Sequence, residues 1–190
     1  MTSILILGWG AFFLLGIGCY TICAIKDEKI VFDSHPLILF KRFKILIPLV
    51  WGEEQTNGDN KLSFISDKSG NTWEASYIWS FVSEEIELAD LLLKKISKRN
   101  IVFDESQNII INPSEFINSQ LLLNNRYEIA RLEGASTFNQ DDRHYCDVVL
   151  IREKKSGACL YAENKGPILN GFLEALSFEE SLVNMELLDQ

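Results

Sequence analysis

One six-residue stretch brings together side chains that could do chemistry. Residues 141–146 read Asp-Asp-Arg-His-Tyr-Cys, so two carboxylates, an imidazole and a thiol lie close together. An imidazole beside a thiol can lower the pKa of the thiol and make it a nucleophile, and the same side chains can hold a metal ion. In a β-strand, Asp142, His144 and Cys146 would share one face. These three residues are therefore the candidate catalytic group.

The same stretch is also typical of a structural strand. A cysteine next to a tyrosine and before a Val-Val-Leu-Ile run is commonly a small core residue. The two histidines, His35 and His144, have no cysteine pair or second histidine at metal-ligand spacing. The sequence contains no GxGxxG, P-loop, HExxH or GxSxG motif. We therefore expect no cofactor and no metal, and favour a protein that is not an enzyme.

The N-terminal part of the chain predicts a membrane anchor. From Ile4 to Ile25 no charged residue, Asn, Gln or Pro interrupts an apolar run that is long enough, as a helix, to cross a bilayer. No basic residue precedes the run, and no small-residue cleavage site follows it, which favours a retained signal-anchor over a cleaved signal peptide. A lipoprotein signal ending at Cys19 is a less favoured alternative. Residues 1–25 are thus predicted to form a single transmembrane helix.

Basic residues predict which side of the membrane holds the rest of the chain. Five of them follow the apolar run closely and none precedes it: Lys26, Lys29, Lys41, Arg42 and Lys44. Because Lys and Arg near a helix end stay on the cytoplasmic side, the C-terminal domain is predicted to be cytoplasmic. An extracytoplasmic domain remains the alternative, since single-pass proteins with short N-terminal tails can break this rule.

The predicted anchor also has a face with small residues. On a helix, one side carries Gly8, Ala11, Leu15, Gly18 and Ile22. Small residues let helix backbones approach closely in lipid, where packing and not the hydrophobic effect drives association. We therefore predict partners of two kinds, the lipid bilayer and either another protein or a second copy bound through this helix.

Residues 26–60 are predicted to be a basic and apolar juxtamembrane segment followed by a linker. Between His35 and Trp51 the chain is apolar except for its three cations, Lys41, Arg42 and Lys44. As a helix, this stretch would suit the membrane surface, with Trp51 at interfacial depth. The alternative is a buried strand or connector whose cations reach solvent along their aliphatic stems. Residues 52–60 are polar and rich in turn formers, as in a linker.

The pattern of residues 61–190 predicts one α+β domain, with a mainly antiparallel sheet packed against helices. A glycine turn joins two strands at 61–66 and 72–81, and the best helix follows at 83–98. The remaining predicted elements are a short strand pair (101–103 and 109–111), a helix from Pro113 to Leu123, strands at 127–133, 145–152 and 158–163, an exposed loop at 134–143, and helices at 167–176 and 178–188.

Charge narrows the range of functions. The chain has a formal net charge of −9 and a pI near 4.8, which argues against a nucleic-acid binder. The basic cluster from Lys94 to Arg99 lies in the last turn of the predicted helix 83–98, where it complements the helix dipole. The sequence therefore predicts a single-pass, membrane-anchored interaction or scaffold subunit of a membrane-associated complex. The alternative is a tethered enzyme or a ligand-binding module with a pocket between sheet and helices.

Overall fold

The computed structural model describes residues 37–47, 51, 54–56, 58–66, 73–82, 85–104, 108–139, 142–168 and 172–188. The predicted transmembrane helix, with its face of small residues, lies outside these ranges. Within them, no helix combines the length and the apolar character needed to cross a membrane.

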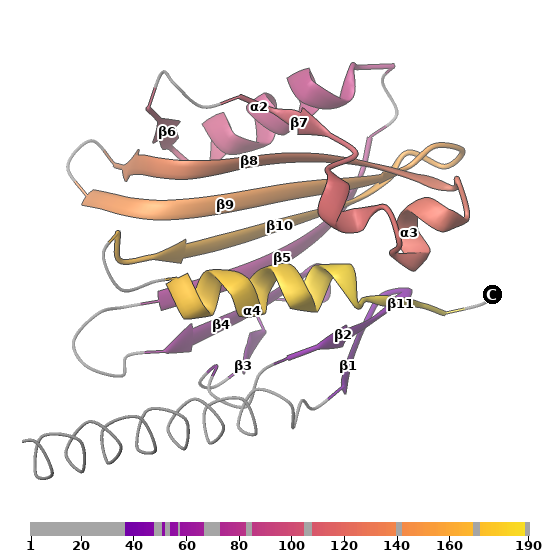
Figure 1. Ribbon diagram of the computed structural model, residues 1–190, viewed down its shortest axis with the longest axis horizontal. Coiled ribbons are helices and arrows are strands. Elements are labelled where there is room, and N and C mark those ends of the chain that lie inside the picture. The colour runs from indigo at the N-terminus through magenta and orange to yellow at the C-terminus, as the bar shows by residue number, and fades with distance from the viewer. Residues whose placement is uncertain are drawn as a thin grey trace, which may run out of the picture.

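The described part of the chain is built on a large antiparallel sheet (Figure 1). Its strand order is β3-β4-β5-β10-β9-β8-β6, and β7 also pairs with β8. The strands are β3 (Glu54–Thr56), β4 (Lys61–Ser66), β5 (Trp73–Phe81), β6 (Ile101–Phe103), β7 (Ile110–Ile111), β8 (Tyr127–Phe138), β9 (Asp142–Glu153) and β10 (Ala158–Gly166). A mainly antiparallel sheet with few helices confirms the predicted α+β class.

Each face of the sheet is covered by one longer helix (Figure 1). Helix α4 (Phe172–Val183) buries Phe178 and Leu182 against one face, with Tyr77 and Leu160 among the sheet residues there. Helix α2 (Leu88–Lys98) covers the other face, which holds Leu132, Val148 and Cys146. The alternation of side chains along a strand separates the two cores.

Helix α2 forms because its apolar residues recur at helical spacing. Leu88, Leu91, Leu92 and Ile96 are buried on one stripe, and charged residues occupy the opposite side. The helix begins at Leu88, five residues after the predicted start at Ser83, and ends where the Arg99 backbone N–H bonds back to the Ile96 carbonyl.

A second, three-stranded sheet joins both ends of the described chain. Its order is β1 (Leu37–Phe40), β2 (Phe43–Leu46) and β11 (Glu186–Leu187). Phe43 and Ile45 are buried in the same core as Trp73. The strand alternative is therefore the correct interpretation of Leu37–Leu46, and these residues, predicted to precede the domain, pack with its core.

Several predicted elements differ from the structure. Strands β6 and β7 both pair with β8 and not with each other. The predicted loop 134–143 is largely strand, because β8 continues to Phe138 and pairs with β9 from Asp142 onward. This end of the β8–β9 ladder carries polar and small residues, so its pattern resembles a loop although its backbone is paired.

The predicted helices also have different bounds. After Pro113 the chain forms only a 3₁₀ turn, η1 (Ser114–Phe116), and a short helix, α3 (Gln120–Leu123). The break predicted at Ser177 is absent, since α4 continues through this buried serine and Phe178 and Leu182 extend its apolar side. The predicted final helix instead ends in β11.

Candidate functional site

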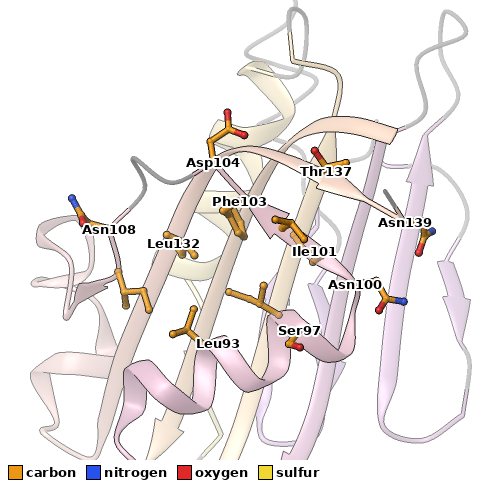
Figure 2. Close-up of a pocket in the computed structure, with 13 residues that line it drawn as sticks. Leu93, Ser97, Asn100, Ile101, Phe103, Asp104, Asn108, Leu132, Thr137 and Asn139 are labelled. Carbon is orange, nitrogen blue, oxygen red and sulfur yellow. The ribbon is translucent and has the colours of Figure 1, made fainter. Parts of the chain in front are cut away.

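An open apolar groove lies between α2, β6 and the residues before β7 (Figure 2). Its volume, open to solvent, is about 1400 Å³. Seven of the residues that line it are apolar: Leu93, Ile96, Ile101, Val102, Phe103, Ile109 and Leu132. We call this feature the groove.

The groove has apolar surface that no residue described by the structure covers. Val102 is 68% exposed and Leu93 is 48% exposed. Val102 is on a three-residue edge strand, so one side of β6 has no neighbouring strand in the sheet order. Exposed apolar surface next to a concavity is a common property of interaction sites, because burying it releases ordered water.

The edge of β6 also presents backbone groups. The Asp104 N–H donates to the Ala135 carbonyl at 3.2 Å, and the Asn139 N–H donates to the Asn100 carbonyl at 3.4 Å. Because antiparallel strands alternate their hydrogen-bonding direction, the backbone groups of Ile101 and Phe103 point away from β8. A partner strand could pair with these groups.

Among the residues that the structure describes, those at the rim of the groove carry little net charge. Its polar side chains are Ser97, Asn100, Asp104, Asn108, Thr137 and Asn139. The Asp104 carboxylate is paired with the Arg143 guanidinium at 2.7 Å. The groove itself therefore suits apolar, uncharged groups.

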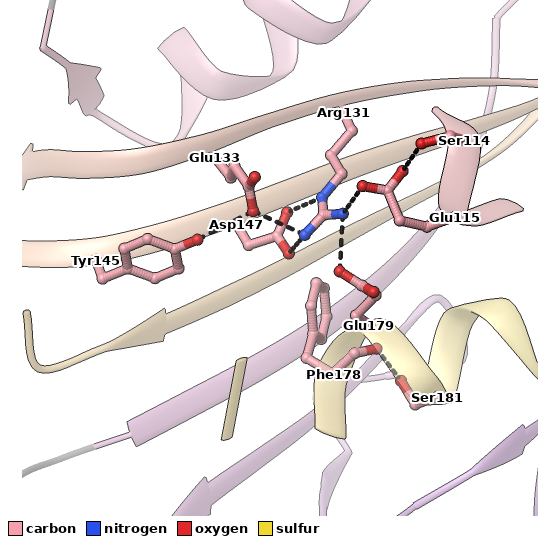
Figure 3. A network of polar contacts seen from close by, with 9 residues as sticks. All are labelled: Ser114, Glu115, Arg131, Glu133, Tyr145, Asp147, Phe178, Glu179 and Ser181. Carbon is pink, nitrogen blue, oxygen red and sulfur yellow. Dashed lines mark hydrogen bonds and ion pairs between the residues drawn. The ribbon is translucent and has the colours of Figure 1, made fainter. Parts of the chain in front are cut away.

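A second site lies on the other face of the sheet, where Arg131 is surrounded by carboxylates (Figure 3). The Arg131 side chain is only 6% exposed and Asp147 is 1% exposed. Nε and Nη2 of Arg131 donate to the two Asp147 oxygens at 3.1 and 2.9 Å. Its Nη2 also donates to Glu133 at 2.7 Å, and its Nη1 lies 2.9 Å from Glu179 and 3.5 Å from Glu115. These five residues are the Arg131 cluster.

The Arg131 cluster perturbs the charge states of its members. Burial raises the pKa of Asp147 to about 7, although Arg131 opposes this shift. Burial lowers the pKa of Arg131, but the charges of Asp147, Glu133 and Glu179 and the hydrogen bond to Asp147 together outweigh burial and raise it. The pKa of Tyr145 is raised by burial and by Glu133, to which its hydroxyl donates at 3.0 Å.

A cavity of about 330 Å³ adjoins the Arg131 cluster between the sheet and α4. Glu115, Glu133 and Glu179 line one side, and Pro167, Ile168 and Leu176 form an apolar wall. The single guanidinium is contacted by four carboxylates, so the formal charge around the cavity is negative. Such a lining suits a small ligand with a positive group and an aliphatic part.

The predicted catalytic group lies on β9, on the face covered by α2. His144 Nε2 is 2.8 Å from Asp142 Oδ2, and the His144 ring packs edge-on against Phe138. Cys146 is fully buried, and burial, followed by Glu163 and Asp147, raises the pKa of its thiol well above the usual value. A protonated, buried thiol is a poor nucleophile, so the geometry favours the structural interpretation of Cys146.

The residues predicted to touch the membrane surface have different environments. Trp51 is 3% exposed and packs on Trp73, with ring centroids 4.5 Å apart. The prediction that Trp51 lies at interfacial depth in the membrane is therefore wrong, because its indole lies in the core. Arg42 pairs with Glu153 at 3.0 Å and Lys44 with Glu186 at 3.1 Å, while Lys41 is exposed in the β1–β2 turn. Lipid contact by these three cations stays a prediction.

Neither the groove nor the Arg131 cluster was predicted from the sequence. A signal for the cluster was present, since Arg131 and Asp147 each interrupt an apolar strand: Ile-Ala-Arg-Leu and Cys-Asp-Val-Val. Charged residues in such positions are rarely buried without partners. No comparable signal marked the groove, whose lining comes from four separate segments.

Comparison with known proteins finds similarity in fold. No family model matches the chain, and no curated protein matches its sequence. The crystal structure of the Saccharomyces cerevisiae Ran-binding protein Mog1p superimposes with a TM-score of 0.52 and 7% identity, covering 82% of this chain and 96% of that one. A point mutant of Mog1 gives the same TM-score and identity, covering 83% and 97%. The solution structure of cyanobacterial PsbP from Synechocystis sp. PCC 6803 has a TM-score of 0.44 and 11% identity, covering 77% and 86%. At these identities, the Mog1 likeness shows that the chain shares a fold.

Proposed function

We propose that this chain is a membrane-anchored interaction subunit whose α+β domain docks a protein partner in the groove. The observation that carries the proposal is the exposure of Leu93 and Val102 beside a concavity of about 1400 Å³. Burying apolar area contributes roughly 25 cal/mol per Å² before the costs of association. The outward backbone groups of β6 add a second means of attachment.

Two further points support this function. The predicted helix 4–25 would hold the domain at a membrane, where a docking subunit recruits or retains other components. Mog1, which has a similar fold, is described as a Ran-binding protein. A fold does not determine function, but the likeness supports protein binding as a use of this architecture.

Site-specific photocrosslinking tests the proposal. A photoreactive amino acid at Val102 in the full chain, expressed in its native membranes, should yield a discrete crosslinked product. The matched control is Leu123, equally exposed at 68% but on α3, away from the groove. The Val102 product should disappear when Leu93 is changed to Asp, because a charge in the groove opposes apolar docking. Equal products from both positions would contradict docking in the groove.

A second candidate function is binding of a small cationic ligand beside the Arg131 cluster. It is favoured by the cavity of about 330 Å³ between the sheet and α4, with its acidic side and apolar wall. A cavity in this position supports the alternative of a ligand-binding module with a pocket between sheet and helices. Titration of the full chain with a short aliphatic diamine, followed by calorimetry, separates the candidates, because only the second predicts saturable heat that Glu179→Gln diminishes.

A further inference from the structure

The two strands that end the large sheet, β6 (Ile101–Phe103) and β3 (Glu54–Thr56), differ in composition (Figure 1). Strand β3 reads Glu-Gln-Thr, whereas β6 reads Ile-Val-Phe and pairs with β8 in an unbroken register. Edge strands usually avoid pairing with a second chain by carrying a charge, a proline or a bulge. Strand β6 carries none of these features along Ile101–Phe103.

The hydrogen bonds between β6 and β8 decide which backbone groups of β6 a partner can reach. The Asp104 N–H donates to the Ala135 carbonyl on β8. Because the bonding direction alternates along an antiparallel strand, the N–H and C=O groups of Ile101 and Phe103 point to the outer side of β6. Within the described ranges, which omit residues 105–107, no strand pairs with this outer side.

A second copy of β6 fits this edge in one register. When two β6 strands run antiparallel about a two-fold axis at Val102, Ile101 of each copy lies opposite Phe103 of the other. In this register, both outward residues of each strand form hydrogen-bonded pairs. Ile101 is buried on the α2 side of the sheet, so Val102, which is 68% exposed, meets Val102 of the second copy on the other side. Aromatic and β-branched residues that face each other in this way stabilise strand pairing.

The charges along this edge also favour a second copy. Each chain has a net charge of −9, so the general electrostatic force between two copies is repulsive. From Asn100 to Asp104 the only charged side chain is Asp104, and this register places it opposite Asn100 of the second copy. Asp104 is also paired with Arg143 at 2.7 Å. Within residues 100–104, therefore, no like charges face each other.

The same pairing adds the groove to the contact. A two-fold axis perpendicular to the sheet keeps both α2 helices on one face, so the two grooves adjoin across the strand junction. Leu93 lines the groove and is 48% exposed. Its apolar surface adds to the area that a second copy buries.

We propose that the partner docked by this domain is a second copy of the chain, joined through antiparallel β6 strands into one continuous sheet. This inference rests on the proposed function and names the partner. The ladder between two three-residue strands is short. The predicted anchor compensates for this, because it keeps the copies in one membrane and raises their local concentration.

Charge substitutions at Val102 test this symmetric contact in the full chain. Two copies with different tags are co-expressed, extracted in mild detergent and purified through one tag. Val102→Asp in both copies, or Val102→Lys in both, should reduce recovery of the second tag about tenfold, because an apolar pair is lost and like charges lie opposite each other. Val102→Asp in one copy with Val102→Lys in the other should restore recovery. Leu123→Asp in both copies is the matched control, since Leu123 is equally exposed at 68% but lies on α3.

A cysteine at the same position tests the register. In isolated membranes treated with a mild oxidant, Val102→Cys should form a disulfide-linked dimer, because opposite residues in a non-hydrogen-bonded pair have Cα atoms about 4.5 Å apart. Cys19 and Cys23 are changed to Ser in this chain to remove thiols from the predicted anchor. Asp104→Cys should not crosslink, since the register separates its two Cα atoms by about 14 Å. Equal crosslinking at both positions would contradict this register.

The outcomes separate this inference from the proposed function. Recovery that no substitution at Val102 changes would mean that the copies associate elsewhere, and it would overturn the inference. If wild-type copies do not co-purify while a photoreactive group at Val102 gives a product that does not have the mass of two chains, the partner is another protein. The inference is then wrong, although docking in the groove stands. Neither co-purification nor any crosslinked product would contradict both.

Discussion

Asp147 is the residue with the most unusual environment in the described chain. It is 1% exposed, and its carboxylate is held by Arg131 while Glu133 and Glu179 lie nearby. Burial raises its pKa to about 7 from an ordinary value of 3.8. The charged form of this carboxyl group is therefore less favourable in the folded state than in the unfolded state.

This environment predicts a pH-dependent stability difference between the wild type and Asp147→Asn. A carboxyl group whose pKa is higher in the folded state than in the unfolded state stabilises the fold most at a pH below the unfolded-state value. This contribution is lost as the pH rises toward about 7, the value in the folded state. The wild type should lose stability relative to the variant across this window, by at most about 4 kcal/mol. Denaturant unfolding of both full chains in detergent between pH 4 and 8 measures the difference. A difference that does not change with pH would show that Asp147 is ionised throughout.

The site residues were only partly predictable. Asp142, His144 and Cys146 could be placed on one strand face from their spacing alone, and they do lie on β9. The burial of Cys146 could not be predicted, because it depends on α2 and Phe138, which pack against this face from other parts of the chain. The partners of Arg131 come from four separate elements, and residue types alone do not specify such contacts.

At the scale of elements, the turn between β9 and β10 depends on Gly157. This residue has φ +69°, and a Cβ placed on it would lie 2.2 Å from the Val82 carbonyl oxygen. The Val82 N–H donates to the Gly157 carbonyl at 2.9 Å. The turn is thus fixed against the chain that follows β5.

Gly157→Ala should therefore be strongly destabilising. A left-handed conformation costs an alanine about 1–2 kcal/mol, and the close approach to Val82 should add roughly 1–3 kcal/mol. Gly58→Ala is the matched control, because Gly58 has φ +87° and open space around the added Cβ. Thermal unfolding of both variants should show the larger decrease for Gly157→Ala. Equal decreases would mean that Val82 moves aside without cost.

Local patterns predicted some elements well. The β4–β5 and β9–β10 hairpins follow from strand patterns joined by glycine turns, and α2 follows from its apolar stripe. The pairing of strands that are far apart in the sequence could not be predicted from these local patterns. The short strands β6 and β7 resemble a hairpin in sequence, yet each of them pairs with β8 instead. The apolar and basic stretch around Lys41 fits a helix or a strand equally well, and only its packing against the core decides.

At the scale of the whole molecule, the predicted anchor and the domain should lie on defined sides of the membrane. Five basic residues after the apolar run predict an external N-terminus and a cytoplasmic domain. Lys155→Cys places a thiol in an exposed turn, whereas the native Cys146 and Cys159 are buried. A membrane-impermeant maleimide should label this variant only after permeabilisation. Labelling in intact cells would place the domain outside. The wild-type chain gives the background labelling of the native cysteines.

The small sheet has a consequence for how the chain is made. Strand β2 pairs with β11, and Lys44 forms an ion pair with Glu186 across 142 positions of sequence. Contacts between residues so far apart form slowly, and in a growing polypeptide they must wait for the second partner. Phe43 and Ile45 have emerged from the ribosome long before β11 is synthesised, so the apolar strand β2 depends on the synthesis of β11 for its last neighbour. The final residues of the domain thus close a sheet begun near its start, and loss of this short C-terminal segment would leave a strand edge open in the newly made protein.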